Sequence, residues 1–393
     1  GADWDEAIGA GTNQLSGTDW VAAAPPPPRA KIQHPFAAPE GGRYQLGAEL
    51  GVGGMGIVRS ARDTRLDRDV AYKHVAKHAH ERAGIGDRFI REARITAFLE
   101  HPAIVPIYDA GESADGEPFY TMRLVRGRSL GDAVTEATDL QARLRLLRHF
   151  LDACEAVAYA HRQGVVHRDL KPDNIMVGEF GETQVVDWGL ARWDAIDGLA
   201  LWAAVTDSPR RARSALSDVS PDEGGGASHV DAIATQNGSV VGTPAYMSPE
   251  QASGGAADTR SDVWSLGVML WQLIAGTHPL AGQSSDQILA AVRAYELPSL
   301  QSRCKDAPAE LCAIVAHAMD ADPVNRYPDA KALAEDVARY IDGRLVQVHM
   351  YSPAEQLRRM IRVYRAPLSV AVVALLLLVV VGGLAARRTQ LEH

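Results

Sequence analysis

The sequence predicts an α+β fold: a small antiparallel β lobe, then a larger helical lobe, and one transmembrane helix near the C-terminus. Short apolar runs broken by turn residues fill Tyr44 to Ala76, which is typical of antiparallel strands. Helical spacing of apolar residues dominates from Val263 to Ile341. From Leu368 to Ala386 the chain is apolar and uncharged for roughly 19 residues, enough to cross a ~30 Å hydrocarbon core.

The elements of the two lobes are expected in the order strands, helix, strands, helices. Strand-like runs occupy Ile57–Arg62, Asp69–Val75, Ile104–Tyr108 and Phe119–Val125. One helix is expected over Phe89–Leu99, where apolar residues follow helical intervals, and a long amphipathic one over Leu140–Arg162.

Changes of composition divide the chain into segments. Residues 1–40, with their run of prolines, predict a disordered arm. The remaining segments are the strand-rich lobe 41–122, the helical lobe with its entry 123–342, a basic juxtamembrane segment 343–366, the span 367–386, and a tail 387–393 that resembles vector-derived residues in part. Within the helical lobe, 190–241 loses all periodicity, and so long a loop is either functional or disordered.

Charge and cysteine content argue against nucleic-acid binding and against a fold held together by disulfides. The formal net charge is −9, from 49 acidic and 40 basic side chains, which argues against nucleic acid as the main partner. Cys154, Cys304 and Cys312 do not have the spacing of metal ligands. So few thiols, in an odd number, indicate a reducing compartment rather than a disulfide framework.

Arginines flank the apolar run unequally. Four precede it and two follow it, at Arg358, Arg359, Arg362 and Arg365, then Arg387 and Arg388. The larger basic cluster belongs on the cytoplasmic side, so we expect a single-pass membrane protein with residues 1–365 in the cytoplasm. The basic segment before the span is equally consistent with contact to anionic lipid and with a solvated turn. A buried helix is the alternative to a span.

A glycine-rich stretch opens the strand-rich lobe at Gly51, Gly53, Gly54 and Gly56. Glycines at this spacing let backbone amides approach phosphate oxygens. A dinucleotide-binding turn has the same spacing but requires a helix directly afterwards. Here a strand, a polar turn and a second strand follow, which favours a flap over a nucleotide.

Lys73 lies in the second of those strands, among apolar neighbours, so its ammonium needs an anionic partner. Glu92, on the polar side of the helix that follows, can supply it. Such an ion pair can hold the α- and β-phosphates of a nucleotide.

The stretch from Val166 to Ile175 contains the residues that most strongly indicate a catalytic function. Asp169 can accept the proton of an attacking hydroxyl, Lys171 can neutralise charge on a phosphoryl group, and Asn174 can bind a metal ion. Asp187 then ends an apolar strand, where a carboxylate is costly without a cation, so a magnesium role is natural.

Taken together, these motifs resemble the eukaryotic-type (Hanks-type) protein serine/threonine kinases, most closely the bacterial membrane-anchored branch. The resemblance runs from about Tyr44 to Ile341 and includes 242–250, which is similar to the segment closing an activation loop, Asp262–Gly267 and Asn325–Tyr327. It implies a two-lobed protein-kinase-like fold that transfers the γ-phosphoryl group of ATP to Ser or Thr hydroxyls of proteins. It also implies Mg²⁺, with Mn²⁺ as a substitute, and a signalling role.

The resemblance assigns further residues. ATP is expected to contact the glycine-rich stretch, the apolar strands and the hinge between the lobes, through Leu50, Gly51, Val52, Gly53, Gly54, Met55, Gly56, Val58, Ala71, Lys73, Met122 and Leu124. Glu250 and Arg326 are expected to form a buried ion pair, and Asp262 to support the catalytic loop. Lys171 is typical of serine/threonine kinases, as is Thr243, which should form part of the peptide platform beside Asp169.

Regulation is expected in the 190–241 loop. Arg168 precedes Asp169, and a phosphorylated residue of the loop could pair with it. Thr235 is the first candidate and Ser239 the second, with self-association allowing phosphorylation in trans. Three departures from the family are Trp188 for phenylalanine, Ser248 for alanine and Arg123 for an acid. A nucleotide-binding pseudokinase scaffold and a small-molecule phosphotransferase are the alternatives.

Overall fold

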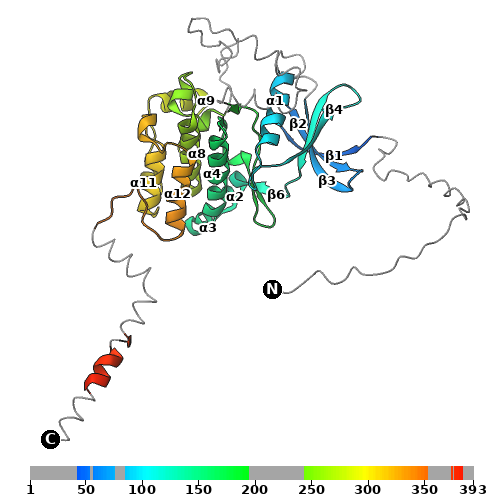
Figure 1. Cartoon of the computed structure of the whole chain (residues 1–393). Helices are drawn as coiled ribbons and strands as arrows, with labels where there is room; N and C mark the ends of the chain where they lie inside the picture. Colours follow the sequence, from blue (N-terminus) through cyan, green and yellow to red (C-terminus); the bar gives the residue numbers. More distant parts are fainter. Residues whose placement is uncertain are drawn as a thin grey trace, which may run out of the picture.

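The computed structural model describes residues 42–53, 56–75, 85–193, 243–352, 373–374 and 376–383. These residues form a strand-rich lobe and a helical lobe that lie side by side (Figure 1). The two-lobed α+β architecture expected from the sequence is therefore confirmed.

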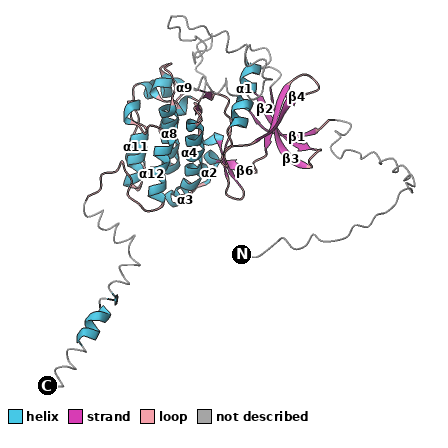
Figure 2. Ribbon diagram, in the orientation of Figure 1, coloured by secondary structure: helices cyan, strands magenta, loops and turns pink. Residues whose placement is uncertain are grey.

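The small lobe is one antiparallel sheet with one helix against it (Figure 2). Its strand order is β1-β2-β3-β5-β4. The strands are β1 (Tyr44–Val52), β2 (Gly56–Asp63), β3 (Arg68–Val75), β4 (Ile107–Glu112) and β5 (Pro118–Arg123). Helix α1 (Ile85–Phe98) packs on the sheet through Phe89, whose ring lies 5.1 Å from that of Tyr120. This contact fixes α1 over the strand that carries Lys73, because β3 and β5 are paired.

The large lobe is built around a helix that is buried on nearly every side. Helix α8 (Thr259–Ala275) buries both its first-turn aspartate and its apolar residues, as expected for a helix at the centre of a lobe. It begins at the Asp258 cap and ends at Gly276, whose φ of 81° suits glycine. The other helices are α2 (Leu130–Glu136), α3 (Leu140–Leu144), α4 (Leu147–Arg162), α7 (Pro249–Ala252), α9 (Ser285–Arg293), α10 (Leu300–Arg303), α11 (Ala309–Ala318) and α12 (Ala330–Ile341).

Short strands and 3₁₀ turns connect the longer elements of the helical lobe. Strands β6 (Gly127–Ser129), β8 (Ile175–Gly178) and β9 (Thr183–Val185) form one small sheet. Strands β7 (Val165–Val166) and β10 (Arg192–Trp193) form another. The 3₁₀ turns are η2 (Pro172–Asn174), η3 (Pro244–Tyr246) and η4 (Pro323–Asn325). The stretch Val166–Ile175 begins on β7 and ends on β8, and Asp262–Gly267 lies on α8.

Two expected elements are wrong in detail. The helix expected over Leu140–Arg162 is two helices, α3 and α4, because the backbone tightens at Leu146, whose N–H donates to the carbonyl of Arg143. The strand expected over Ile104–Tyr108 starts only at Ile107. Pro106 precedes Ile107 and has no N–H for a ladder, so Ile104 forms only an isolated bridge, to Val185.

Several predictions fall on residues outside the described part. The arm 1–40, Gly54, Met55, Thr235 and Ser239 lie there, as do half of 367–386 and the four arginines before it, Arg358, Arg359, Arg362 and Arg365. Among the residues that are described, no helix is both long and apolar enough to span a membrane.

Candidate active site

The glycine-rich stretch forms a strand-turn-strand hairpin. Val52 pairs with Ile57 across β1 and β2, and the Gly53 N–H donates to the carbonyl of Gly56 at 2.8 Å. A Cβ on Gly56 would lie 2.4 Å from the carbonyl oxygen of His74, so the close packing of β2 on β3 requires glycine there. No helix follows the glycines, which excludes the dinucleotide-binding alternative.

Apolar side chains expected to contact adenine lie on the strands around Lys73. Ala71 on β3 pairs with Met122 on β5, and Leu124 follows at the end of that strand. On the hairpin, Leu50 and Val52 are 53% and 62% exposed, and Val58 pairs with Lys73. The sheet thus carries apolar residues beside a buried cation, as a nucleotide site needs.

Lys73, Glu92 and Asp187 meet between the lobes. The ammonium nitrogen of Lys73 lies 2.5 Å from Oε1 of Glu92 and 3.4 Å from Oδ1 of Asp187. Tyr120 donates its hydroxyl to the same Glu92 oxygen at 2.7 Å. Glu92 is only 1% exposed, so the expectation that it lies on the polar side of its helix is wrong. It points inward because both of its partners lie on the sheet.

The cluster holds two carboxylates on one ammonium, and the pKa values reflect this imbalance. Burial would lower the pKa of Lys73, but Glu92 and Asp187 outweigh it and the pKa is raised. Burial raises the pKa of Glu92, assisted by repulsion from Asp187 and opposed by Lys73. Burial acts on Asp187 in the same direction, but Lys73, His167 and Lys171 lower its pKa. Asp187 is therefore an ionised carboxylate, and its side chain is 41% exposed.

Asp169 lies on a loop whose backbone is hydrogen-bonded to Asp262 on α8. The two carboxylate oxygens of Asp262 accept the backbone N–H groups of His167 and Arg168, each at 2.8 Å. Asp262 is fully buried, and His161 contacts it at 2.9 Å through Nε2. Burial would raise the pKa of Asp262, but His161 and these neighbours lower it, so it remains charged. The support that the resemblance implies for the loop is present.

Asn174 and Asp187 lie at the same end of a strand pair. Strands β8 and β9 pair Ile175 with Val185, and the next N–H, of Val186, donates to the carbonyl of Asn174 at 2.9 Å. The Asn174 amide nitrogen donates to the carbonyl of Asp169 at 2.9 Å, which leaves its amide oxygen for another partner. An amide oxygen and an ionised carboxylate are ligands that Mg²⁺ accepts, and the excess negative charge of the cluster favours a cation. The residues fit a magnesium site.

Thr243 joins Asp169 and Lys171. Its N–H donates to Oδ1 of Asp169 at 3.0 Å, and its hydroxyl accepts from the ammonium of Lys171, also at 3.0 Å. Lys171 lies 3.6 Å from Asp169 as well. The start of η3 is thereby fixed beside the carboxylate that sequence analysis assigned as the base.

Trp188 packs inside, as expected. It is fully buried, and its ring lies 4.5 Å from that of His167. Its indole N–H has no partner among the described residues. Burying an unpaired donor costs free energy, which offsets part of the stabilisation from packing this ring.

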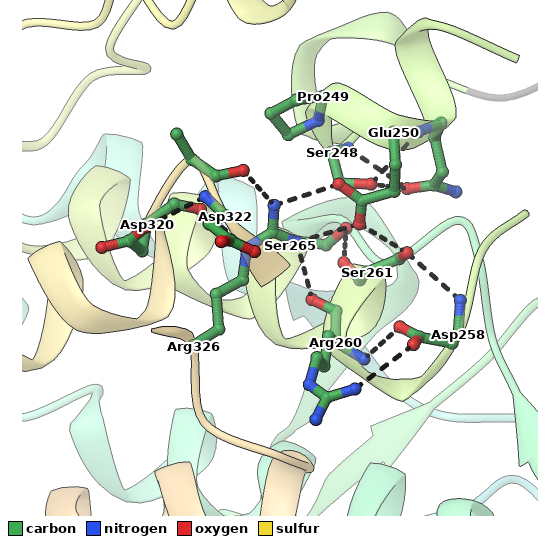
Figure 3. Close-up of polar contacts among 12 residues, drawn as sticks. Ser248, Pro249, Glu250, Asp258, Arg260, Ser261, Ser265, Asp320, Asp322 and Arg326 are labelled. Atoms are coloured by element: carbon green, nitrogen blue, oxygen red, sulfur yellow. Dashed lines mark hydrogen bonds and ion pairs between the residues drawn. The ribbon is translucent and has the colours of Figure 1, made fainter. Parts of the chain in front are cut away.

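Glu250 and Arg326 form a closed ion pair away from this cluster (Figure 3). Two nitrogens of Arg326 donate to the two oxygens of Glu250, at 2.9 and 3.0 Å. Ser261 also donates to Glu250, at 2.8 Å, and the guanidinium lies 4.9 Å from the centre of the Trp264 ring. Burial would raise the pKa of Glu250, but the hydrogen bond from Arg326 lowers it. The pair joins α7 to α8 and η4.

Sequence analysis missed Tyr120 and His161. Each contacts a singled-out acid, but the partners lie 28 and 101 residues away along the chain. The inward position of Tyr120 on an alternating strand is a weak signal. For His161 the local pattern of its helix gives none.

Comparison with known protein families gives a match that covers most of both lobes. The model of the protein kinase domain family matches residues 44–198 and 225–337, more than half of the chain. This chain belongs to the protein kinase family.

Several similar proteins are bacterial serine/threonine-protein kinases. The chain is 35% identical over 320 residues to serine/threonine-protein kinase PknD of Protochlamydia amoebophila and 36% identical over 305 residues to serine/threonine-protein kinase PknB of Mycobacterium tuberculosis. It is 34% identical over 310 residues to a probable serine/threonine-protein kinase of Streptomyces coelicolor. These matches cover 77 to 78% of this chain but only 30 to 43% of the relatives, so the chain spans less than half of their length. The resemblance to Hanks-type kinases is confirmed.

Proposed function

We propose that this protein transfers the γ-phosphoryl group of ATP to serine or threonine hydroxyls of proteins. The observation that carries the proposal is the meeting of Lys73, Glu92 and Asp187, with Asp169 and Asn174 on the adjoining loop. The names of the bacterial relatives support the same reaction.

The reaction divides among these side chains by position. Lys73, held by Glu92, binds the α- and β-phosphates. A carboxylate oxygen of Asp169 accepts the proton of the substrate hydroxyl while the hydroxyl oxygen forms a bond to the γ-phosphorus. The bond from the γ-phosphorus to the β–γ bridging oxygen breaks, and ADP is released. Lys171, 3.6 Å from Asp169, offsets negative charge on the moving phosphoryl group. Positioning and charge supply most of the rate.

Asn174 and Asp187 would hold the metal ion. Mg²⁺, or Mn²⁺ in its place, would supply positive charge that offsets the charge of the phosphate groups. The contact of Lys171 with Thr243 supports a serine or threonine substrate, because both residues are typical of serine/threonine kinases and they lie together beside Asp169.

The test is phosphate incorporation by the full chain, with radiolabelled ATP and Mg²⁺. We expect autophosphorylation and phosphorylation of protein substrates by the wild type. Asp169→Asn should abolish both and leave nucleotide binding within about threefold, because Asp169 contacts the hydroxyl rather than ATP. Nucleotide binding without incorporation in the wild type would instead identify a pseudokinase scaffold, and equal activity in Asp169→Asn would refute the assignment of the base.

We also propose a membrane signalling role, with residues 367–386 as a single span and the kinase domain in the cytoplasm. The uncharged apolar run and its flanking arginines support this proposal. Deleting 367–386 should move the protein from the membrane fraction to the soluble one.

Mass spectrometry of wild-type and Asp169→Asn protein tests Thr235 and Ser239 as autophosphorylation sites.

A further inference from the structure

His278 lies in the connection between α8 and α9, and its ring bridges two backbone groups. Nε2 lies 2.8 Å from the carbonyl oxygen of Ala245 in η3. Nδ1 accepts the N–H of Leu280 at 3.1 Å. A carbonyl oxygen can only accept, so Nε2 carries the proton, and Nδ1 is the bare acceptor. This histidine is therefore neutral and held in one tautomer.

The turn that His278 contacts is the one that starts at Thr243. Residues 243–246 are here called the platform segment, and Thr243 contacts both Asp169 and Lys171. Farther along, Ser265 on α8 donates to the carbonyl of Tyr246 at 2.8 Å. The Tyr246 hydroxyl donates to Gln272 at 2.6 Å, and its ring meets the His278 ring edge-on at 5.4 Å. Among the hydrogen bonds of the described residues, the one from His278 is the only one that reaches this segment from the α8–α9 connection.

The platform segment has no polar contact with Lys73, Glu92 or Asp187 among the hydrogen bonds of the described residues. A disturbance at Ala245 therefore reaches Asp169 and Lys171 before it reaches the Lys73 cluster, which is assigned to the α- and β-phosphates and the metal ion. We therefore expect a larger effect of His278 on the protein substrate than on the binding of ATP.

We propose that His278 is a positioning residue for the protein substrate: its bond to Ala245 fixes the platform segment that presents the acceptor hydroxyl to Asp169. The proposal rests on the proposed kinase function. Burial lowers the pKa of His278 and its bond to Ala245 opposes this, which agrees with the neutral tautomer at physiological pH.

Two isosteric variants separate the two bonds of the ring. In His278→Gln the side-chain amide nitrogen can reach the position of Nε2 and donate to Ala245. In His278→Asn the shorter amide can replace Nδ1 as the acceptor for Leu280 but does not reach Ala245. His278→Ala removes both. A matched control is His317→Ala on α11, because that ring also meets a tyrosine edge-on, Tyr327, at 4.5 Å.

The experiment measures steady-state kinetics of the full chain with ATP and a synthetic peptide, selected from a serine/threonine peptide library as a wild-type substrate. We expect His278→Ala and His278→Asn to raise the peptide KM about five- to tenfold, the usual effect of losing one buried hydrogen bond. His278→Gln should stay within twofold of the wild type. The KM for ATP should stay within twofold in every variant, and His317→Ala should change neither KM.

Two results would overturn the inference. One is a His278→Asn variant with wild-type peptide KM while His278→Gln loses binding, which would make the bond to Leu280 the important one. The other is an equal rise in both KM values for His278→Ala, because the effect would then not be specific to the protein substrate. Thermal unfolding of each variant identifies a loss of folding, which would lower the apparent kcat instead. A wild-type protein that phosphorylates no library peptide refutes the proposed function itself, so the two failures are distinct.

Discussion

Two buried ion clusters in this molecule differ in how completely their charges are matched. Arg326 uses all five of its N–H donors, on Glu250 and on the carbonyls of Arg260, Asp320 and Ala321. Around Lys73, two carboxylates share one ammonium, and Oε2 of Glu92 has no partner within the described part of the chain. A matched cluster holds elements together, whereas an unmatched one has bonds left for a ligand.

Breaking the matched cluster should have the largest effect. Arg326→Met leaves Glu250 without its cation, and we expect the free energy of unfolding to fall by about 3–5 kcal/mol. Urea denaturation followed by circular dichroism measures it. Arg344→Met is the matched control, because Arg344 is 74% exposed beside Asp342 and should cost less than about 1 kcal/mol. Equal losses in both variants would remove the distinction between the clusters.

Breaking the unmatched cluster should affect catalysis more than stability. Lys73→Met removes the charge assigned to the phosphates, and we expect phosphorylation to fall about 10²–10³-fold. The free energy of unfolding should fall by less than half of the Arg326→Met loss, because Glu92 can take up a proton once its cation is gone. Lys331→Met, at a lysine that is 63% exposed, is the control for both measurements. A Lys73→Met protein that keeps activity and loses stability would invert the comparison.

The two glutamates should respond to acid in opposite directions, with effects of the order of 1 kcal/mol. The pKa of Glu250 is lowered in the folded state, so its stabilisation is present above the ordinary value of 4.5 and is lost as pH falls below it. The pKa of Glu92 is raised, so the folded state takes up a proton first and gains stability as pH falls toward 4.5.

Urea denaturation between pH 4 and 7 tests this contrast in Glu250→Gln and Glu92→Gln. The advantage of the wild type over Glu250→Gln should shrink on acidification. Relative to Glu92→Gln, the wild type should gain. Parallel pH dependences for the two variants would contradict the assigned directions.

Sequence analysis reached the clusters because their residues sit in short motifs with fixed spacing. Asp169 and Asn174 share one loop, and the apolar neighbours of Lys73 indicated an anionic partner. The meeting of these distant stretches was implied by the family resemblance. The burial of Glu92 was missed because it depends on Tyr120, which the local pattern of the helix does not reveal. The division of the helix at Leu146 likewise follows from packing: Arg143 reaches the carbonyl of Ile274 at 3.1 Å, on another helix.

The span predicted at 367–386 and the phosphorylation sites predicted in the 190–241 loop stay predictions. They depend on residues that the structure does not describe. What the sequence could not supply for the described part is the set of contacts between distant elements, such as those of His161 and His278.

The residues on either side of 194–242 both contact the catalytic loop or the strand that precedes it. On one side Trp193 pairs with Val165 on β7, two residues before His167. On the other, the N–H of Thr243 donates to Asp169. Cleavage of a peptide bond within 194–242 would leave two fragments, each still bound to the catalytic loop or the strand that precedes it by one of these contacts. The entropy of loop closure grows only with the logarithm of loop length, so shortening 194–242 should change the free energy of folding little. The energy of folding therefore constrains the length of 194–242 only weakly.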